Sequence, residues 1–295
     1  MKPFEYISAR SIEETCTVLE QYGSDARILA GGTDLLIEYR RSHAKMPKVI
    51  VDISHARELG GIIESNGSMN IKPLTTHTQL LQSDILSRFA PLLGSAASTI
   101  GSPQIRNRGT VGGNIMNAAA CADTVPPLIA LGAVITLQSH NGSRRMNLMD
   151  LFIKPYETAV RPDEVLTEIH CSKLPSEAKS AFIKLGRRNA LAISRLSVAA
   201  ILHIGRDGRI AEARIVPGAA FPTWQRVTDA EQMLAGERPS RKLFSAAGKK
   251  VSDDMIAHTG RRWSTEYKEP VIAVLVRRAL EQCVQRNVFL EGVEA

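Results

Sequence analysis

Residues 99–115 read TIGSPQIRNRGTVGGNI, a stretch dense in glycine, amide and hydroxyl groups. Glycine allows backbone N–H groups to turn toward one point without a side chain in the way. Residues 100–125 show no clear helical or strand period, so we expect an ordered loop region there. Such a loop suits an anionic group. Its candidate binding residues are Thr110, Val111, Gly112, Gly113 and Asn114.

A second glycine segment lies upstream, where a predicted strand over residues 27–30 runs into Gly31 and Gly32. A short helix is expected over residues 33–41, and its N-terminus would favour a phosphate. A strand–helix turn that merely uses glycine explains this segment equally well by itself. Two such loops on adjacent segments, however, predict a clamp for a diphosphate. Neither the GxGxxG pattern of a Rossmann fold nor a P-loop motif occurs.

The rest of the pattern predicts an α+β chain in three parts, residues 1–57, 58–175 and 176–295. The first part is βαββ-like, with a helix that Ser11 caps and a strand over residues 48–54. The second part has expected helices at 78–89, 91–99 and 126–131 and a hairpin that turns at Asn141-Gly142. The third part has expected strands at 181–187, 196–204 and 210–216. Helices follow at 228–235, 240–251 and 270–286, the last with Pro270 in its first turn.

Composition narrows the classes of function. The chain has 295 residues, of which 44% are hydrophobic and 23% charged, which is typical of a soluble globular protein. It has no apolar run of 18 residues and no secretory signal at the N-terminus, so we expect a cytoplasmic protein without a membrane span. The four cysteines form no CxxC pair, and the seven histidines do not cluster. We therefore expect no metal site and no catalytic triad, and chemistry that a cofactor carries.

The net charge of +7 comes partly from scattered arginine pairs without interleaved aromatic residues. Nucleic-acid binding lacks both a stacking platform and a motif, so we expect none. Solvated surface together with an acidic partner or an anionic cofactor explains the charge better.

Four features together resemble the FAD-binding medium subunits of molybdenum hydroxylases, relatives of the xanthine, carbon monoxide and nicotinate dehydrogenases. They are AGGTDLL at 30–36, the stretch 99–115, Asp123, and FIKLGRR at 182–188. The resemblance covers nearly the whole chain. It implies a vanillyl-alcohol-oxidase/PCMH-type FAD-binding fold of two α+β subdomains, 1–57 and 58–175. A C-terminal α+β domain, 176–295, would add a three-stranded antiparallel sheet with helices.

The resemblance also implies noncovalent FAD and a role for individual residues. One diphosphate loop would be Leu29, Ala30, Gly31, Gly32, Thr33 and Asp34, and the other would be Thr110 to Asn114. Ile100 would lie beside a FAD ring, Asp123 would contact the sugar or ribityl chain, and Val165 and Leu166 would touch the flavin. Lys184 matches a flavin-proximal lysine to within one residue.

Each of these residues also has a simpler interpretation. Asp123 suits a helix N-cap, Val165 and Leu166 suit a core strand, and Lys184 suits the surface. Arg106 and Arg108 suit either phosphate contacts or ion pairs that hold the loop. His77 suits the start of a helix better than a covalent flavin link, because the resembling family binds FAD without one.

The implied function is an electron-transfer subunit. A molybdopterin-binding large subunit would oxidise a purine or other N-heterocycle, and a small subunit with [2Fe-2S] clusters would pass electrons to this FAD. NAD(P)+ is one expected electron acceptor. In relatives that use NAD, however, the segment after the arginine pair carries acidic residues, whereas here residues 188–194 read RNALAIS. This segment looks closer to the nicotinate-dehydrogenase type. The cysteine-rich insertion of 4-hydroxybenzoyl-CoA reductase is absent. The alternatives are a stand-alone flavin oxidoreductase of the same fold and a nonenzymatic basic binding module.

Overall fold

The first part of the chain is a parallel sheet whose strands all end at the same edge. A computed structural model describes residues 4–40, 46–188 and 191–284. The strand order is β1-β3-β2, with β1 at Glu5–Ser8, β2 at Ala26–Leu29 and β3 at Val49–Asp52. Helix α1 (Ile12–Tyr22) begins as predicted at Ser11, whose hydroxyl accepts from the Glu14 amide at 3.0 Å. Because β2 ends at the carboxyl edge, the Gly31-Gly32 segment leaves the sheet there.

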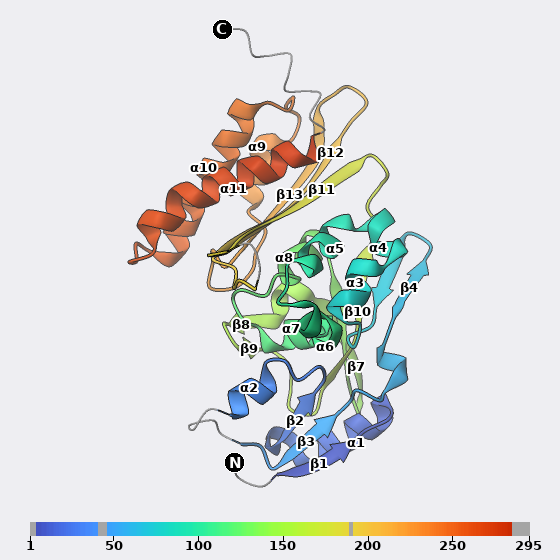
Figure 1. Ribbon diagram of the computed structural model, residues 1–295. Coiled ribbons are helices and arrows are strands. Elements are labelled where there is room, and N and C mark those ends of the chain that lie inside the picture. Colours follow the sequence, from blue (N-terminus) through green and yellow to red (C-terminus); the bar gives the residue numbers. More distant parts are fainter. Residues whose placement is uncertain (1–3, 41–45, 189–190, 285–295) are drawn as a thin grey trace.

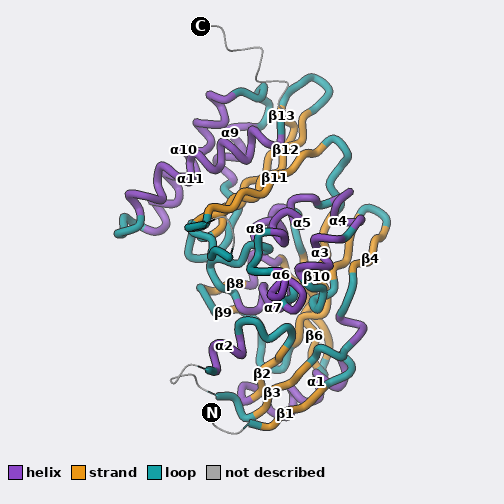
Figure 2. The backbone as a smooth tube through the Cα atoms, viewed as in Figure 1, coloured by secondary structure: helices purple, strands orange, loops and turns teal. Residues whose placement is uncertain are grey.

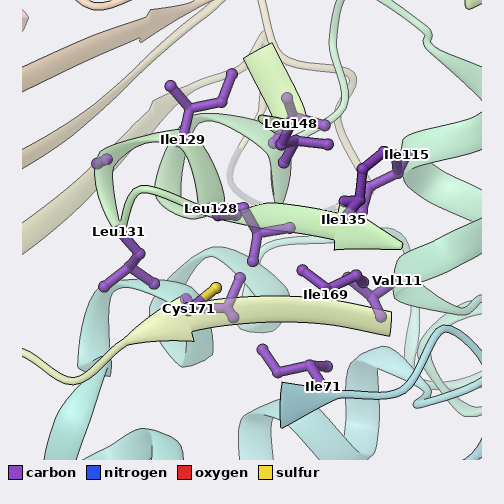
Figure 3. Packing of buried hydrophobic residues seen from close by; sticks show 14 of the residues in the cluster. Ile71, Val111, Ile115, Leu128, Ile129, Leu131, Ile135, Leu148, Ile169 and Cys171 are labelled. Carbon is purple, nitrogen blue, oxygen red and sulfur yellow. The ribbon is translucent and has the colours of Figure 1, made fainter. Parts of the chain in front are cut away.

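The middle part is an antiparallel sheet of order β4-β5-β10-β6-β7, covered by short helices (Figure 1). The strands are β4 Ile62–Ser65, β5 Ser68–Ile71, β6 Val134–Ser139, β7 Gly142–Asn147 and β10 Val165–Ser172. The predicted hairpin at Asn141-Gly142 is confirmed, since Ser139 pairs with Gly142. The small strands β8 (Phe152–Lys154) and β9 (Glu157–Thr158) form a separate pair. Figure 3 shows Val111 and Ile115 packed beside Ile135 of β6 and Ile169 of β10.

Short helices replace the loop that we expected over residues 100–125, so that prediction is wrong. Helix α6 (Pro103–Arg108) starts after the Ser102 cap, and α7 (Val111–Asn117) starts after the Thr110 cap. A helix of six or seven residues completes too few turns to show a period. The expected helix over 78–89 is likewise two helices, α3 (His77–Gln82) and α4 (Asp84–Phe89), divided at Ser83. The neighbouring helices are α5 (Pro91–Ser98) and α8 (Val125–Ala130), and α2 (Leu35–Tyr39) belongs to the first part.

The C-terminal part is a three-stranded antiparallel sheet with helices on one face, as predicted (Figure 2). Its strands are β11 (Ala178–Leu185), β12 (Leu196–Ile204) and β13 (Ile210–Gly218), and its helices are α9 (Thr228–Leu234), α10 (Arg241–Thr259) and α11 (Thr265–Cys283). The placement of Pro270 in the first turn is wrong, because α11 begins five residues earlier and Pro270 lies inside it. Pro270 has no N–H to donate to a carbonyl one turn back. No described helix is both long and apolar enough to cross a bilayer.

The C-terminal sheet packs its other face on α5 and α8 of the middle part. Ala199, Ile201 and Val216 belong to the same apolar core as the middle helices. The rings of Phe152 and Trp224 lie 4.5 Å apart at this contact. The middle and C-terminal parts therefore share one buried core, and loops from both can meet at its margin.

Candidate cofactor site

The Gly31-Gly32 segment packs directly on the backbone that precedes α7. A Cβ at Gly31 would lie 2.0 Å from the carbonyl oxygen of Arg108 and 3.1 Å from the Cα of Gly109. Gly32 has a φ of +72°, in the left-handed region that favours glycine. The structure therefore brings the two glycine segments together across the junction of the first and middle parts, as the sequence predicted.

The first segment offers unpaired backbone donors. Among the described residues, the amides of Gly31, Gly32, Thr33 and Asp34 donate no hydrogen bond, whereas the Leu36 amide donates to the Gly32 carbonyl at 3.3 Å. Backbone N–H groups away from water nearly always have a partner. Consecutive free amides in a glycine turn are the usual donor set for phosphate oxygens. This segment can therefore hold an oxyanion.

The second segment differs, because its amides are already paired inside the fold. The amides of Val111, Gly112, Gly113 and Asn114 each donate to an acceptor in the protein. These acceptors are the Thr75 carbonyl (3.0 Å), the Pro73 carbonyl (2.9 Å), the Thr110 hydroxyl (3.1 Å) and the Thr110 carbonyl (2.9 Å), respectively. The Asn114 side chain accepts from the Thr124 hydroxyl at 2.7 Å. Residues 111–114 thus present a wall of satisfied amides, and the run of free backbone donors lies on the opposite loop.

Helix α7 fixes both ends of that donor loop. Gly31 meets Arg108 before the helix begins, and the Asn117 side chain at its end donates to Asp34 at 3.2 Å. Partial desolvation raises the pKa of the Asp34 carboxyl. The donor loop therefore lies along α7, which gives its amides a fixed setting.

A buried ionic network lies where the C-terminal part meets the middle part. Asp123 is only 5% exposed, and the Lys184 ammonium donates to it at 2.7 Å and to the Thr99 carbonyl at 3.0 Å. The Ser194 hydroxyl donates to the other Asp123 oxygen. Burial raises the pKa of Asp123, while Lys184 and Ser194 act in the opposite direction.

This network overturns two simpler interpretations. The cap position of α8 is Thr124, so Asp123 is not the helix cap. The Lys184 side chain is 10% exposed, so it is not a surface lysine. Ser194, from the loop before β12, completes the network, and no local pattern in the sequence pointed to it.

The arginines of residues 99–115 have structural partners or face solvent. The Arg106 guanidinium donates to the Ile100 carbonyl at 3.0 Å, which is neither a phosphate contact nor an ion pair. It holds the turn at Gly101, whose φ is +47°. Ile100 itself is half-buried, and the Arg108 side chain is exposed.

Comparisons with known proteins show the family of the chain. The pattern of the family described as the FAD binding domain in molybdopterin dehydrogenase matches residues 2–174. The chain belongs to this FAD-binding family. A second pattern, the CO dehydrogenase flavoprotein C-terminal domain, matches residues 180–283.

Three relatives of this FAD subunit show the extent of the likeness. The chain is 33% identical to the 6-hydroxypseudooxynicotine dehydrogenase complex subunit alpha of Paenarthrobacter nicotinovorans, over 97% of both chains. It is 34% identical to the xanthine dehydrogenase FAD-binding subunit of Escherichia coli O157:H7, over 88% of this chain and 89% of that one. The carbon monoxide dehydrogenase structure from Hydrogenophaga pseudoflava superposes with a TM-score of 0.89 at 30% identity, covering 96% of this chain and 98% of that one.

The donor set fits FAD, whose diphosphate needs several N–H donors at close range. The free amides of residues 31–34 could supply them, and glycine at 31 and 32 would let the diphosphate approach the backbone without meeting a side chain. Within residues 4–40, 46–188 and 191–284, no group of three or more His, Cys, Asp or Glu side chains is placed to hold a metal ion.

Two predicted flavin contacts lie in the apolar core. Val165 packs with the core of the first part, and Leu166 packs with the core of the middle part. Their core interpretation is confirmed, and flavin contact stays a prediction. The predicted helix start at His77 is also confirmed, since Thr76 caps α3.

The His77 imidazole is buried against Gly109. Desolvation, with a smaller contribution from the Arg106 charge, lowers its pKa to about 4. The Nδ1 atom has no hydrogen-bond partner in the described part of the chain. The ring is therefore neutral at physiological pH, and it supports the backbone of the second segment.

Proposed function

We propose that this FAD subunit holds its cofactor noncovalently along α7, with the diphosphate on the amides of residues 31–34. The observation that carries the proposal is the run of free amides on a glycine turn that α7 fixes at both ends. Leu29, Ala30, Thr33 and Asp34 complete this loop, and Thr110 to Asn114 form the facing wall. Asn114 contributes an Nδ2 group that donates to nothing else among the described residues.

The remaining predicted contacts would orient the ring end of the cofactor. Asp123 would accept a hydroxyl of the sugar or ribityl chain, because each carboxylate oxygen keeps a lone pair beyond its bond to Lys184 or Ser194. Ile100 and the Val165–Leu166 strand would give the flavin an apolar border. When bound, FAD supplies the chemistry of accepting electrons singly and releasing them in pairs. The protein positions it and sets the charge nearby.

We propose further that this subunit passes electrons from iron–sulfur clusters of a small subunit to an acceptor such as NAD(P)+. The molybdopterin-binding large subunit would oxidise a purine or other N-heterocycle. Two relatives support this class of substrate by name, since xanthine is a purine and 6-hydroxypseudooxynicotine carries a pyridine ring. The division into residues 1–57, 58–175 and 176–295 is part of the same proposal.

Two purifications test the proposal, one of the isolated chain and one of its native complex. The isolated chain should be yellow and release FAD on denaturation, and the complex should carry molybdenum and iron. A colourless chain that FAD does not reconstitute would contradict cofactor binding. Turnover of substrate by the isolated chain would favour a stand-alone flavin oxidoreductase.

A further inference from the structure

The end of the C-terminal sheet carries a cation–aromatic contact, and further basic residues lie beside that aromatic residue in the chain. Arg195, just before β12, places its guanidinium carbon 5.4 Å from the centre of the Tyr267 ring. Lys268 follows Tyr267 in α11 and donates to the Ala219 carbonyl at 2.7 Å. Burial lowers the pKa of Lys268, and the charges of Arg262 and Arg195 lower it further. We call Arg195, Arg262, Trp263, Tyr267 and Lys268 the basic–aromatic surface.

Carboxylates of the described chain do not neutralise this surface. Arg262 donates to the Thr259 carbonyl at 3.0 Å, and none of the three cations forms a salt bridge within residues 4–40, 46–188 and 191–284. Of the two nearby acids, Glu269 pairs with Arg261 at 2.9 Å, and Glu266 lies in the first turn of α11. Like charges that repel one another in the free chain are stabilised when an anionic surface covers them.

The same surface exposes large apolar groups. Trp263 is 91% exposed and Tyr267 is 44% exposed. Ile193, two residues before Arg195, is 76% exposed. Tryptophan, tyrosine and arginine are the residues that dominate the binding energy of protein interfaces. An exposed tryptophan among unpaired arginines is therefore more typical of an interface than of a solvated surface.

The hollows described for the chain lie away from the basic–aromatic surface. Two hollows of the described chain lie in the first part, one around Arg10, His55 and Arg57 and one around Ile7 and Val18. Neither hollow includes a residue of the basic–aromatic surface. Small ligands prefer concave sites that bury most of their area, whereas protein partners bind to flatter ones.

We propose that the basic–aromatic surface docks a carboxylate-bearing face of another subunit of the oxidoreductase complex. This inference rests on the proposed function, which makes the chain one subunit among several. The position also links docking to the cofactor site, because Arg195 directly follows Ser194, which donates to the buried Asp123. A subunit that binds Arg195 thus contacts the loop that completes the Asp123 network.

Variants of the exposed residues test the interface without disturbing the fold. Trp263→Ser and Arg262→Glu are made in the chain within its native complex, and dissociation is followed by mass photometry over a dilution series. We expect the dissociation constant of the chain from the remaining subunits to rise roughly 30-fold for Trp263→Ser, the effect of a typical hot spot. The rise for Arg262→Glu should shrink as salt screens the charges. FAD content per chain should stay at the wild-type level.

Two matched controls and a cross-link make the test specific. Tyr156→Ser removes another exposed aromatic side chain, and Arg238→Glu reverses another exposed arginine of the same domain; both should assemble normally. Arg262→Lys keeps the charge and provides an amine, so carbodiimide should couple it to a carboxylate of a neighbouring subunit. Wild-type dissociation of both test variants would overturn the proposal. The proposal would also be overturned if these variants assembled normally but used NAD(P)+ less well, because that result would indicate a site for a small anion. Loss of FAD in the isolated wild-type chain would instead refute the proposed function.

Discussion

Replacing Gly31 by alanine is the sharpest test of how the donor loop is held. The new Cβ would lie 2.0 Å from the Arg108 carbonyl oxygen, whereas ordinary contact begins near 3.4 Å. The loop must therefore retreat from α7 by roughly 1.4 Å. Overpacking of this kind costs about 1–3 kcal/mol. The free chain can relax because the loop lies at the surface, so most of the cost should fall on the bound state.

The expected result is weaker FAD binding with little change in stability. At about 1.4 kcal/mol per tenfold change, the Kd should rise roughly 5-fold to 150-fold. Quenching of FAD fluorescence by the apo chain measures it, and thermal unfolding without FAD checks the fold. Gly94→Ala is the matched control, because its Cβ would meet only the Leu80 carbonyl at 3.7 Å. If Gly31→Ala bound FAD with the wild-type Kd, packing on Arg108 would not be what positions the amides.

Three further changes probe the rest of the structure. Lys184→Met should leave the Asp123 carboxylate buried without its cation, which should lower the free energy of unfolding in urea by about 3–5 kcal/mol. Adding Asp123→Asn to this variant should recover part of the lost stability. The pKa of His77 in the folded chain is lowered to about 4, so the buried neutral imidazole stabilises the fold fully above pH 6.5. As pH falls toward 4, the free energy of unfolding should drop by at most roughly 3 kcal/mol. His77→Phe should flatten this part of the profile of urea stability against pH. Gly248→Ala places a Cβ 2.3 Å from the Ala273 carbonyl, so calorimetry should show a loss of about 1–3 kcal/mol, with the FAD Kd unchanged.

Local chemistry predicted the elements that carry a strong local signal. Ser11 and Asn141-Gly142 gave a helix start and a hairpin where the structure has them. The three C-terminal strands were predicted to within a few residues, because each is long enough to show its apolar pattern. The spacing of apolar residues does not reveal helices α6 and α7, because each has only six or seven residues. Their caps, Ser102 and Thr110, were the better signal.

The predicted clamp could not be completed from the sequence, because its asymmetry depends on tertiary contacts. Residues 110–114 are as rich in glycine and amides as residues 30–34. The amides of Val111 and Gly112 are nevertheless satisfied by Thr75 and Pro73, more than thirty residues away in the chain, and those of Gly113 and Asn114 by Thr110. Motif composition shows that backbone donors exist, but only the fold shows which of them are free. The first loop, the weaker of the two motifs as a sequence signal, is the one with free donors.

If Asp123 contacts FAD as proposed, its network gives the C-terminal domain a direct role at the cofactor site. A carboxylate buried this deeply is unfavourable unless it is paired and hydrogen-bonded, and both of its side-chain partners, Lys184 and Ser194, come from the C-terminal part. The Lys184 ammonium also holds the Thr99 carbonyl, one residue before Ile100, so the same cation fixes the start of the 99–115 stretch. Displacing the loop at Ser194 would therefore change the hydrogen bonding of Asp123 without touching either glycine segment. Through this network, an event at the surface of the C-terminal domain can reach the proposed ring end of FAD.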